Sequence, residues 1–352
     1  MPLRVRSLSI IFVLLLTIYT LAVHITNIVH IFSSEPYSGI ALSQSAIRDA
    51  YINGTAGEAV IPKRIHQIYH DWSGRGVPHT AQWMRLRASC IDRTSGWIHK
   101  LWSASESREF IQREYPWFLS TYDSYRYPIQ RVDAIKYFAL RHYGGIYIDF
   151  DNGCLESLEP LRHYPVFTTD TNQGPLPTNL LGAVPQHPYY KFLTDSLPSR
   201  NWLYWPFPYI TINYASGRWF HTDMWERYHR KNGYRNVNQP QDANGPLYRV
   251  IMDRRRGAEP WVFWNEGAGR TWENWDNSVF SWISDHATTV VRIAVAVSML
   301  LTVLTGAIVW KCCLRGRKEG MKTKAGLKTA VSLLSPEMTQ SEHSFAKKND
   351  LV

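Results

Sequence analysis

The chain has 352 residues, a hydrophobic content of 45% and a formal net charge of +10. This length and this apolar content allow a sizeable core in one large domain or two smaller ones. The basic balance does not indicate a nucleic-acid partner, because residues 311–352 carry nine Lys or Arg against four acids and the first six residues carry two Arg. Charge that lies in the flanks leaves no basic face on a folded domain, so we predict no nucleic-acid binding.

The N-terminal part is predicted to be a membrane anchor followed by a stalk. Residues 7–32 contain no Asp, Glu, Lys or Arg. This apolar run is longer than that of a cleaved signal peptide, and no small-x-small cleavage site follows it, so we expect a transmembrane signal anchor with residues 1–6 before it. Residues 33–58 show no strong period and are predicted to form a stalk. Asn53-Gly-Thr55 in this stretch is a possible N-glycosylation site.

The chain then shows the pattern of alternating strands and helices. Hydrophobic periodicity, with Pro and Ser as boundary signals, predicts these elements: a strand within 59–70, a helix over 79–91, a strand over 97–102, a helix that begins at Ser103, and two helices that start near Pro116 and Pro128. Ser103 and Glu106 have the spacing of a capping box, which supports the start of the second helix, at Ser103.

The most informative stretch runs from Tyr127 to Cys154. Apolar residues recur at i, i+3, i+4 spacing, then two glycines and a short apolar run lead to Asp149-Phe150-Asp151. This order predicts an amphipathic helix, a tight turn and a buried strand that ends in two carboxylates. Residues i and i+2 of a strand point to the same face, and a break at Asp151 would let both carboxylates converge on one hard divalent cation. The alternative is a pair of turn residues without a ligand.

Shorter elements follow this stretch. We expect strands near 166–169 and 179–184, helices over 187–197 and 208–230, a polar connection over 231–258, and a strand over 261–264. Strands that alternate with helices, and a ligand site at the carboxyl end of a strand, predict an open α/β sheet with flanking helices. Cys90 and Cys154 would form a disulfide in an oxidising compartment if they lie close together, and the sequence leaves that open.

The C-terminal part is predicted to cross the membrane a second time, over residues 290–310. The eighteen apolar residues from Ile293 would form a helix of about 27 Å, close to the thickness of the hydrocarbon core. Arg4 and Arg6 before the first span, and a basic cluster after the second, place both ends of the chain in the cytosol. The folded domain, residues 59–285, would then be lumenal, and residues 311–352 would be a basic, disordered cytosolic tail.

Two motifs, at residues 131–137 and 143–151, resemble those of a known family. Arg131-Val-Asp133-Ala-Ile-Lys136-Tyr137 and Tyr143-Gly144-Gly145-Ile-Tyr147-Ile-Asp149-Phe-Asp151 resemble the motifs of the DXD glycosyltransferases, and more closely those of the fungal mannosyltransferases of glycosyltransferase family 32. Within that family, residues 115–123, 125–130, 206–211 and 215–217 look like the corresponding stretches of the inositol-phosphorylceramide mannosyltransferases. Lys136 stands where the family usually has Arg, which keeps the charge but loses the bidentate fork. The resemblance implies the GT-A nucleotide-sugar-binding fold over roughly residues 60–285.

The resemblance also implies roles for individual residues. Asp149 and Asp151 would hold a divalent cation, with Mn²⁺ expected and Mg²⁺ or Ca²⁺ as alternatives. The candidate catalytic residues are Asp149, Asp151 and Asp133. The candidate donor-binding residues are His66, Gln67, Trp72, Arg131, Asp133, Lys136, Gly145, Tyr147 and Asn179. The family usually has a His near the end of the domain that can complete the metal shell; this chain has none there, and Glu266 is the candidate in its place.

The function that the resemblance implies is retaining transfer of mannose from GDP-mannose to inositol phosphorylceramide. The implied site is the lumen of the Golgi, with the ER or vacuolar membrane as alternatives, and the family suggests a regulatory membrane subunit. Two other functions stay open: a mannosyltransferase that acts on glycoprotein glycans, and a catalytically weak partner subunit of a transferase complex. An Asp–Lys salt bridge between Asp133 and Lys136, without any donor contact, also remains open.

Overall fold

The structure is a computed structural model of the chain. It describes residues 38–71, 81–172, 174–203, 206–232, 247–252, 260–267 and 274–286, with scattered positions at 16–20 and 289–329. The chain divides into two compact units, Met1–Ala287 and Thr288–Val352. Over these described ranges no helix has both the length and the hydropathy that a membrane span needs. Most of the predicted span 7–32 and part of the span 290–310 lie outside them.

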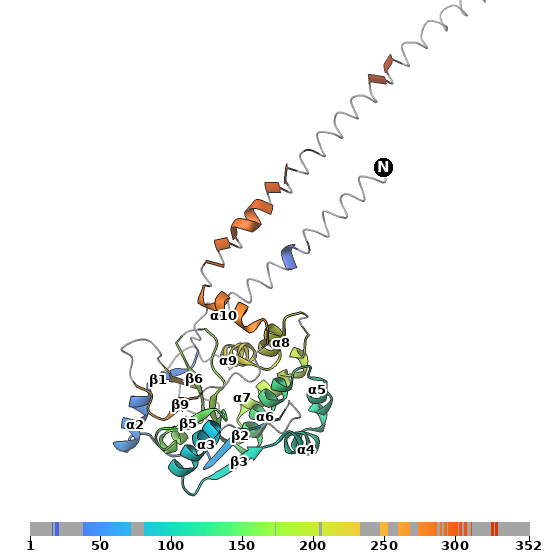
Figure 1. Cartoon of the computed structure of the whole chain (residues 1–352). Coiled ribbons are helices and arrows are strands. Elements are labelled where there is room, and N and C mark those ends of the chain that lie inside the picture. Colours follow the sequence, from blue (N-terminus) through green and yellow to red (C-terminus); the bar gives the residue numbers. More distant parts are fainter. Residues whose placement is uncertain are drawn as a thin grey trace, which may run out of the picture. The chain divides into compact units, whose positions relative to one another are not determined.

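A seven-stranded mixed sheet forms the centre of the first unit (Figure 1). Its strands, in spatial order, are β1 (Ile40–Leu42), β8 (Tyr248–Ile251), β6 (Val166–Asp170), β7 (Leu180–Ala183), β4 (Gly145–Ile148), β2 (Arg64–Ile68) and β3 (Ile98–Trp102). Within it, β7 runs antiparallel to both of its neighbours, and the other described pairs are parallel. A second sheet pairs β5 (Asn152–Cys154) with β9 (Trp264–Glu266). This open mixed sheet confirms the predicted α/β class and fits the GT-A fold.

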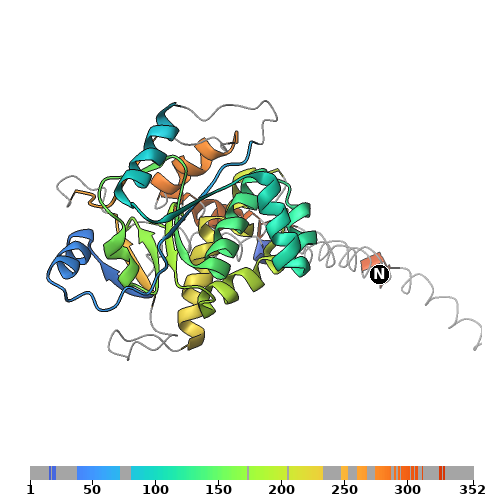
Figure 2. The ribbon, with the colours of Figure 1, turned by 90° about the horizontal axis from the view of Figure 1, so that it is seen from below.

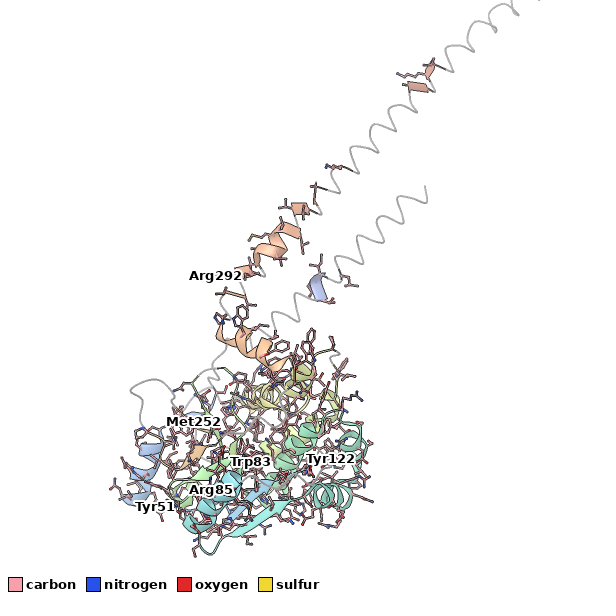
Figure 3. All side chains as sticks on the ribbon, viewed as in Figure 1. Tyr51, Trp83, Arg85, Tyr122, Met252 and Arg292 are labelled. Atoms are coloured by element: carbon pink, nitrogen blue, oxygen red, sulfur yellow. A yellow bond between two sulfur atoms is a disulfide. The ribbon has the colours of Figure 1, made fainter. Side chains whose placement is uncertain are left out.

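Helices cover both faces of the large sheet, and side chains fill the space between the layers (Figure 3). Figure 2 shows the teal and green helices on one side of the sheet and the blue helix α2 on the other. The helices are α2 (Gln44–Ile52), α3 (Ala81–Arg93), α4 (Ala104–Glu114), α5 (Leu119–Ser124), α6 (Pro128–Tyr143), α7 (Pro188–Ser196), α8 (Pro208–Ala215), α9 (Arg218–Asn232) and α10 (Asn277–Asp285), with 3₁₀ turns η1 (Pro116–Phe118), η2 (Glu159–His163) and η3 (Pro198–Arg200). Successive residues of β4 enter the two cores alternately: Tyr147 packs in one, and Ile146 and Ile148 pack in the other.

Helix α6 and the two glycines after it aim β4. Pro128 starts the helix, and Gln130 Oε1 accepts a hydrogen bond from the Tyr127 N–H at 3.0 Å. Nearly every residue from Gln130 to Leu140 is buried, so the helix that we predicted to be amphipathic is covered on most sides. Gly144 and Gly145 have φ of +61° and +99°. A Cβ on Gly145 would lie 2.7 Å from the Arg64 carbonyl oxygen, so this turn requires glycine.

Several predicted elements are confirmed. The strands expected near 166–169 and 179–184 are β6 and β7, and the strand over 97–102 is β3. The capping box of Ser103 and Glu106 is present at the start of α4. The strand expected within 59–70 is shorter, because β2 begins only at Arg64.

Other predictions for the fold are wrong. The expected stalk, residues 33–58, contains β1 and α2, and β1 is an edge strand of the large sheet paired with β8. Strand β8 lies within the expected connection 231–258. The helix expected over 208–230 is two helices, because the chain breaks at Ser216 and Gly217. The strand expected at 261–264 begins at Trp264 instead.

Cys90 and Cys154 form a disulfide that joins α3 to β5. The sequence left this pairing open, since the two residues are 64 positions apart. Cys154 lies three residues after Asp151, and its backbone N–H also donates to Ser89 Oγ of α3 at 2.9 Å. The disulfide therefore ties the carboxylate loop to a helix on the face of the sheet.

We expect the double substitution Cys90→Ala/Cys154→Ala to lower the free energy of unfolding by about 2–4 kcal/mol, because a cross-link over a loop of this length restricts the unfolded chain. Urea unfolding followed by Trp fluorescence measures the change. Cys312→Ala/Cys313→Ala is the matched control, which removes two thiols and leaves the disulfide intact. Equal stability of the two double variants would contradict the prediction.

Candidate active site

The two carboxylates lie in the connection between β4 and β5, at the carboxyl end of β4. The Asp149 N–H donates to the Asn179 carbonyl oxygen at 2.8 Å, and the Gly267 N–H donates to the Asp151 carbonyl oxygen at 2.8 Å. Segments about 30 and 116 residues further along the chain therefore hold both ends of the loop. In the register of β5 and β9, Glu266 lies opposite Asn152, the residue that follows Asp151 in the chain.

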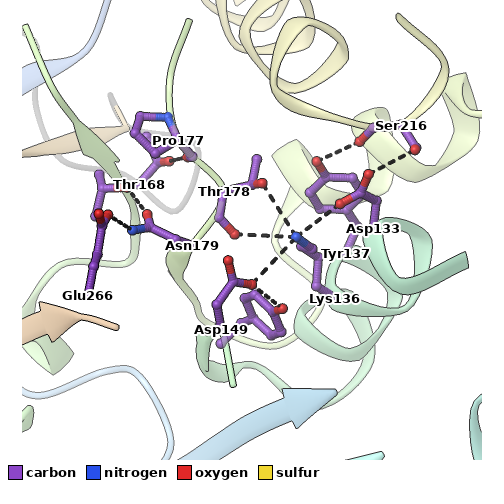
Figure 4. Close-up of polar contacts among 12 residues, drawn as sticks. Asp133, Lys136, Tyr137, Asp149, Thr168, Pro177, Thr178, Asn179, Ser216 and Glu266 are labelled. Carbon is purple, nitrogen blue, oxygen red and sulfur yellow. Dashed lines mark hydrogen bonds and ion pairs between the residues drawn. The ribbon is translucent and has the colours of Figure 1, made fainter. Parts of the chain in front are cut away.

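Lys136 of α6 is the centre of the polar network at this edge (Figure 4). Its Nζ lies 3.0 Å from Asp133 Oδ1 and 3.9 Å from Asp149 Oδ1. It also donates to the carbonyl oxygen and the hydroxyl of Thr178, each at 3.4 Å. Burial alone would lower the pKa of Lys136, but the neighbouring carboxylates outweigh burial and raise it. The ammonium is therefore a fixed positive charge beside Asp149.

Asp133 is buried and has two partners. Oδ1 contacts Lys136, and Oδ2 accepts a hydrogen bond from the Ser216 hydroxyl at 3.0 Å. The Tyr137 hydroxyl in turn donates to the Ser216 carbonyl oxygen at 2.9 Å. The salt bridge that the sequence left open is thus present, and it links α6 to the end of α8. A donor contact of Asp133 remains a prediction.

Tyr147 and Asn179 orient the remaining acidic groups. The Tyr147 hydroxyl donates to Asp149 Oδ1 at 2.5 Å, as expected for residues i and i+2 on one face of a strand. Asn179 accepts from the Thr169 hydroxyl through Oδ1 and donates to Glu266 Oε1 through Nδ2, both at 2.8 Å. Asn179 is therefore held between β6 and β9.

The residues fit a hard divalent cation. Burial, followed by the charges of Asp149 and Glu266, raises the pKa of Asp151 to about 7. The Lys136 ammonium does not fully offset this opposition between the carboxylates, and a bound divalent cation would add the remaining positive charge through their oxygen atoms. No group of three acidic, His or Cys side chains close enough to hold an ion occurs in the part of the chain that the structure describes. Glu266, bonded to Asn179, therefore does not complete a three-carboxylate site in this conformation.

Two of the predicted donor-binding residues, His66 and Arg131, make their polar contacts within the fold, and a third, Trp72, is not described. His66 is fully buried: its Nε2–H donates to the Gly144 carbonyl oxygen at 2.9 Å, and its Nδ1 accepts from the Trp102 indole at 3.2 Å. Burial lowers the pKa of His66 to about 4, so the ring is neutral and supports the glycine turn instead of facing a ligand. Arg131 donates to carbonyl oxygens of residues 122, 123 and 125, which places it at the end of α5. Trp72 lies outside the described residues.

Gln67 and Asn152 are further hydrogen-bond donors in buried positions next to the carboxylate loop. Both are 2% exposed, and the side-chain N–H₂ groups of both find no partner within the described ranges. An unpaired buried amide is costly unless a ligand or water satisfies it. Gln67 therefore keeps its predicted donor-binding role as a proposal, and Asn152 is a residue that the sequence reasoning missed, although it directly follows the DXD triplet.

Thr178 and Ser216 were also missed. Each contacts the Asp133–Lys136 pair from a segment more than 40 residues away along the chain. A hydroxyl of this kind has no local sequence signal. Two signals could have suggested them: Thr178 stands next to Asn179, and Ser216 lies in a stretch, residues 215–217, that carries the family resemblance.

Comparison with known proteins places this site in a class. Residues 80–168 match the family model described as "Glycosyltransferase sugar-binding region containing DXD motif". This segment contains α3, α6, β4 and both carboxylates. Residues 80–168 are therefore similar to the sugar-binding region of the DXD glycosyltransferases, and the resemblance drawn from the motifs is confirmed.

The chain is also similar to fungal proteins with more specific names. The chain is 35% identical over 239 residues to inositol phosphoceramide mannosyltransferase 2 of Schizosaccharomyces pombe, which covers 67% of this chain and 65% of the relative. It is 34% identical over 260 residues to mannosyl phosphorylinositol ceramide synthase CSH1 of Saccharomyces cerevisiae, with coverages of 69% and 64%. Against mannosyl phosphorylinositol ceramide synthase SUR1 of the same yeast it is 40% identical over 185 residues, with coverages of 51% and 47%. The chain thus spans less than two thirds of the length of each.

Among solved structures, the PaToxG glycosyltransferase matches at 13% identity and a TM-score of 0.35, and covers 54% of this chain and 80% of that one.

Lys136→Met should lower the free energy of unfolding by about 3–5 kcal/mol, because it leaves the buried Asp133 carboxylate without its cation. Lys136→Arg keeps the charge and should cost much less. Thermal and urea unfolding of the two variants would measure the difference. The buried pair would not be the source of stability if both variants unfolded alike.

The affinity for Mn²⁺ should rise with pH up to about pH 7 and then level off, because the cation competes with the proton on Asp151. The folded pKa of Asp151 lies above its unfolded value, so the metal-free chain should also lose stability as the pH rises from about 4 to about 7. Titration of free Mn²⁺ by electron paramagnetic resonance at several pH values tests the first statement. Glu266→Gln removes one charge that opposes ionisation of Asp151, so the midpoint of the rise in Mn²⁺ affinity should move to lower pH. An affinity that does not depend on pH would refute the assignment of Asp151 as a metal ligand.

Proposed function

We propose that this protein is a membrane-bound retaining mannosyltransferase that transfers mannose from GDP-mannose to inositol phosphorylceramide. The observation that carries the proposal is the pair Asp149 and Asp151 at the end of β4, with the Lys136 ammonium 3.9 Å from Asp149. The names of these relatives, which describe transfer of mannose to an inositol-containing ceramide, support the choice of donor sugar and acceptor.

In the proposed reaction, the bond between the sugar anomeric carbon and the donor phosphate breaks, and a bond to an acceptor hydroxyl oxygen forms on the same face. Asp149 and Asp151 would hold a divalent cation, preferably Mn²⁺, which supplies Lewis-acid stabilisation of the leaving diphosphate. Lys136 contributes a second positive charge at this edge, and Asp133 holds its ammonium in place. The departing phosphate accepts the proton of the acceptor hydroxyl, so no side chain serves as a nucleophile.

The location proposed for this chemistry is the lumen of the Golgi. Predicted spans over 7–32 and 290–310 would anchor the chain with both ends in the cytosol, and a membrane subunit would regulate it. The Cys90–Cys154 disulfide supports a lumenal domain, because disulfides persist in oxidising compartments. Asn53 is exposed at the end of α2, where a glycan would meet no packed surface.

The double variant Asp149→Asn/Asp151→Asn should lower the transfer rate by about a thousandfold, since loss of the cation removes about 4 kcal/mol of transition-state stabilisation. The assay supplies the full chain in detergent with GDP-mannose, inositol phosphorylceramide and Mn²⁺, and detects mannosylated lipid by mass spectrometry.

Glu109→Gln is the control for this assay, because it removes an exposed carboxylate on α4, outside the site. It should react like the unchanged chain. Product from the double variant at the unchanged rate would refute the role of the two carboxylates. If no chain forms mannosylated lipid but the unchanged chain transfers mannose to a glycoprotein glycan, the acceptor is the glycan and not inositol phosphorylceramide.

A further inference from the structure

An exposed apolar surface lies at the ends of α8 and α10. It consists of Trp275, Trp282, Val279 and Phe207, whose exposed fractions are 64%, 51%, 49% and 39%. The rings of Phe207 and Trp275 lie 6.2 Å apart, so the two segments share this surface, which we call the α8–α10 face. Figure 1 shows α8, α9 and α10 toward the same end of the first unit.

The α8–α10 face is not the core side of these helices. Phe280 and Ile283 of α10 pack inward against Ile210 and Trp219, which belong to α8 and α9. The Phe280 ring also stacks on Tyr209 at 5.2 Å. Helix α10 therefore has apolar residues on its packed side and on its outward side. A surface helix that faces water has a polar outward side. The apolar outward side of α10 is therefore not typical of a helix exposed to water.

The chemistry of the exposed side chains indicates what covers them. Trp has an apolar ring system with one polar N–H, and it is enriched where a hydrocarbon phase meets water. Two Trp residues stand on this face, and Trp202 and Leu203, just before Phe207 in the chain, are exposed as well, at 66% and 58%. The observed set has the composition of a membrane-interface belt.

The chain sequence leads from this face into an apolar run. Helix α10 ends at Asp285, and a mainly apolar stretch of eighteen residues without Asp, Glu, Lys or Arg begins at Ile293. A segment of that length and composition partitions into a bilayer. Eight fully extended positions span at most about 29 Å, so the chain itself keeps the end of α10 within that distance of the start of this segment.

We propose that the α8–α10 face lies in the interfacial region of a lipid bilayer. The occupant is the bilayer surface itself, and the contact requires neither the donor nor the acceptor of the proposed reaction.

Helix α8 connects this face to the carboxylate site. Phe207 on the α8–α10 face precedes its first residue, Pro208, and Ser216, which donates to Asp133, follows its last residue, Ala215. Eight helical residues span about 12 Å. A lipid headgroup that leaves the bilayer at this face would thus need to extend only about the length of α8 to reach the Asp133–Lys136 pair. This consequence rests on the proposed transfer reaction, whereas the bilayer contact rests only on the membrane anchoring that belongs to the proposed function.

The contact is tested with a fluorescent label on the full chain. In a background of Cys312→Ser/Cys313→Ser, Val279→Cys is labelled with an environment-sensitive fluorophore, and the chain is placed singly into nanodiscs of phosphatidylcholine and phosphatidylinositol. Glu109→Cys on α4 is the matched control at an exposed position. Trp282→Cys gives a second labelling position on the α8–α10 face, so a folding defect of one variant does not end the test.

A doxyl-bearing lipid should quench the label at position 279 several-fold more than the label at 109, and aqueous iodide should quench the label at 109 more strongly. Iodide quenching at 279 equal to that at 109 would overturn the proposal, because the face would then be in water. Protection of 279 from both quenchers would also overturn it, because another protein segment would then cover the face. None of these outcomes depends on transfer activity, so failure here is distinct from failure of the proposed function.

Discussion

The arrangement of this site depends on one buried charge, the ammonium of Lys136. It lies 3.0 Å from Asp133 and 3.9 Å from Asp149, and so joins the middle of α6 to the end of β4. A buried cation is stable only among groups that neutralise and hydrogen-bond it. Asp133 also accepts a hydrogen bond from Ser216, which lies between α8 and α9, so the same network contacts the junction of these two helices. The carboxylate loop is therefore built around a charge that is itself part of the core.

Backbone geometry sets the positions of the Asp149 and Asp151 carboxylates. The turn at Gly144 and Gly145 leaves no room for a side chain, and buried His66 supports it from the neighbouring strand. Strand β4 is only four residues long, so any error in the turn would change the direction of Asp149. Beyond the loop, the β5–β9 pair and the Cys90–Cys154 disulfide hold its other end. Rigid elements on both sides favour a fixed position for a cation ligand pair.

Two features connect this site to the membrane proposed for it. The disulfide suits an oxidising lumen, and the α8–α10 face suits the surface of a bilayer. Helix α8 has the exposed Phe207 at one end and Ser216, bonded to Asp133, at the other. A soluble acceptor would need no such surface beside the site, whereas a lipid acceptor has to be met at the membrane.

The sequence by itself determined the α/β class, the helix-turn-strand order and the two DXD carboxylates, because each follows from local periodicity, turn residues and neighbours in the chain. Tertiary structure decided the rest of the site. The strands β1 and β8 are three and four residues long, and they pair with strands far away in the chain. Segments this short have no local sequence pattern that predicts a strand. The interior position of His66, the place of Arg131 at the end of α5, and the bond from Asn179 to Glu266 likewise depend on contacts that only the packed chain creates. Sequence spacing predicts which residues share a face, and packing decides what that face meets.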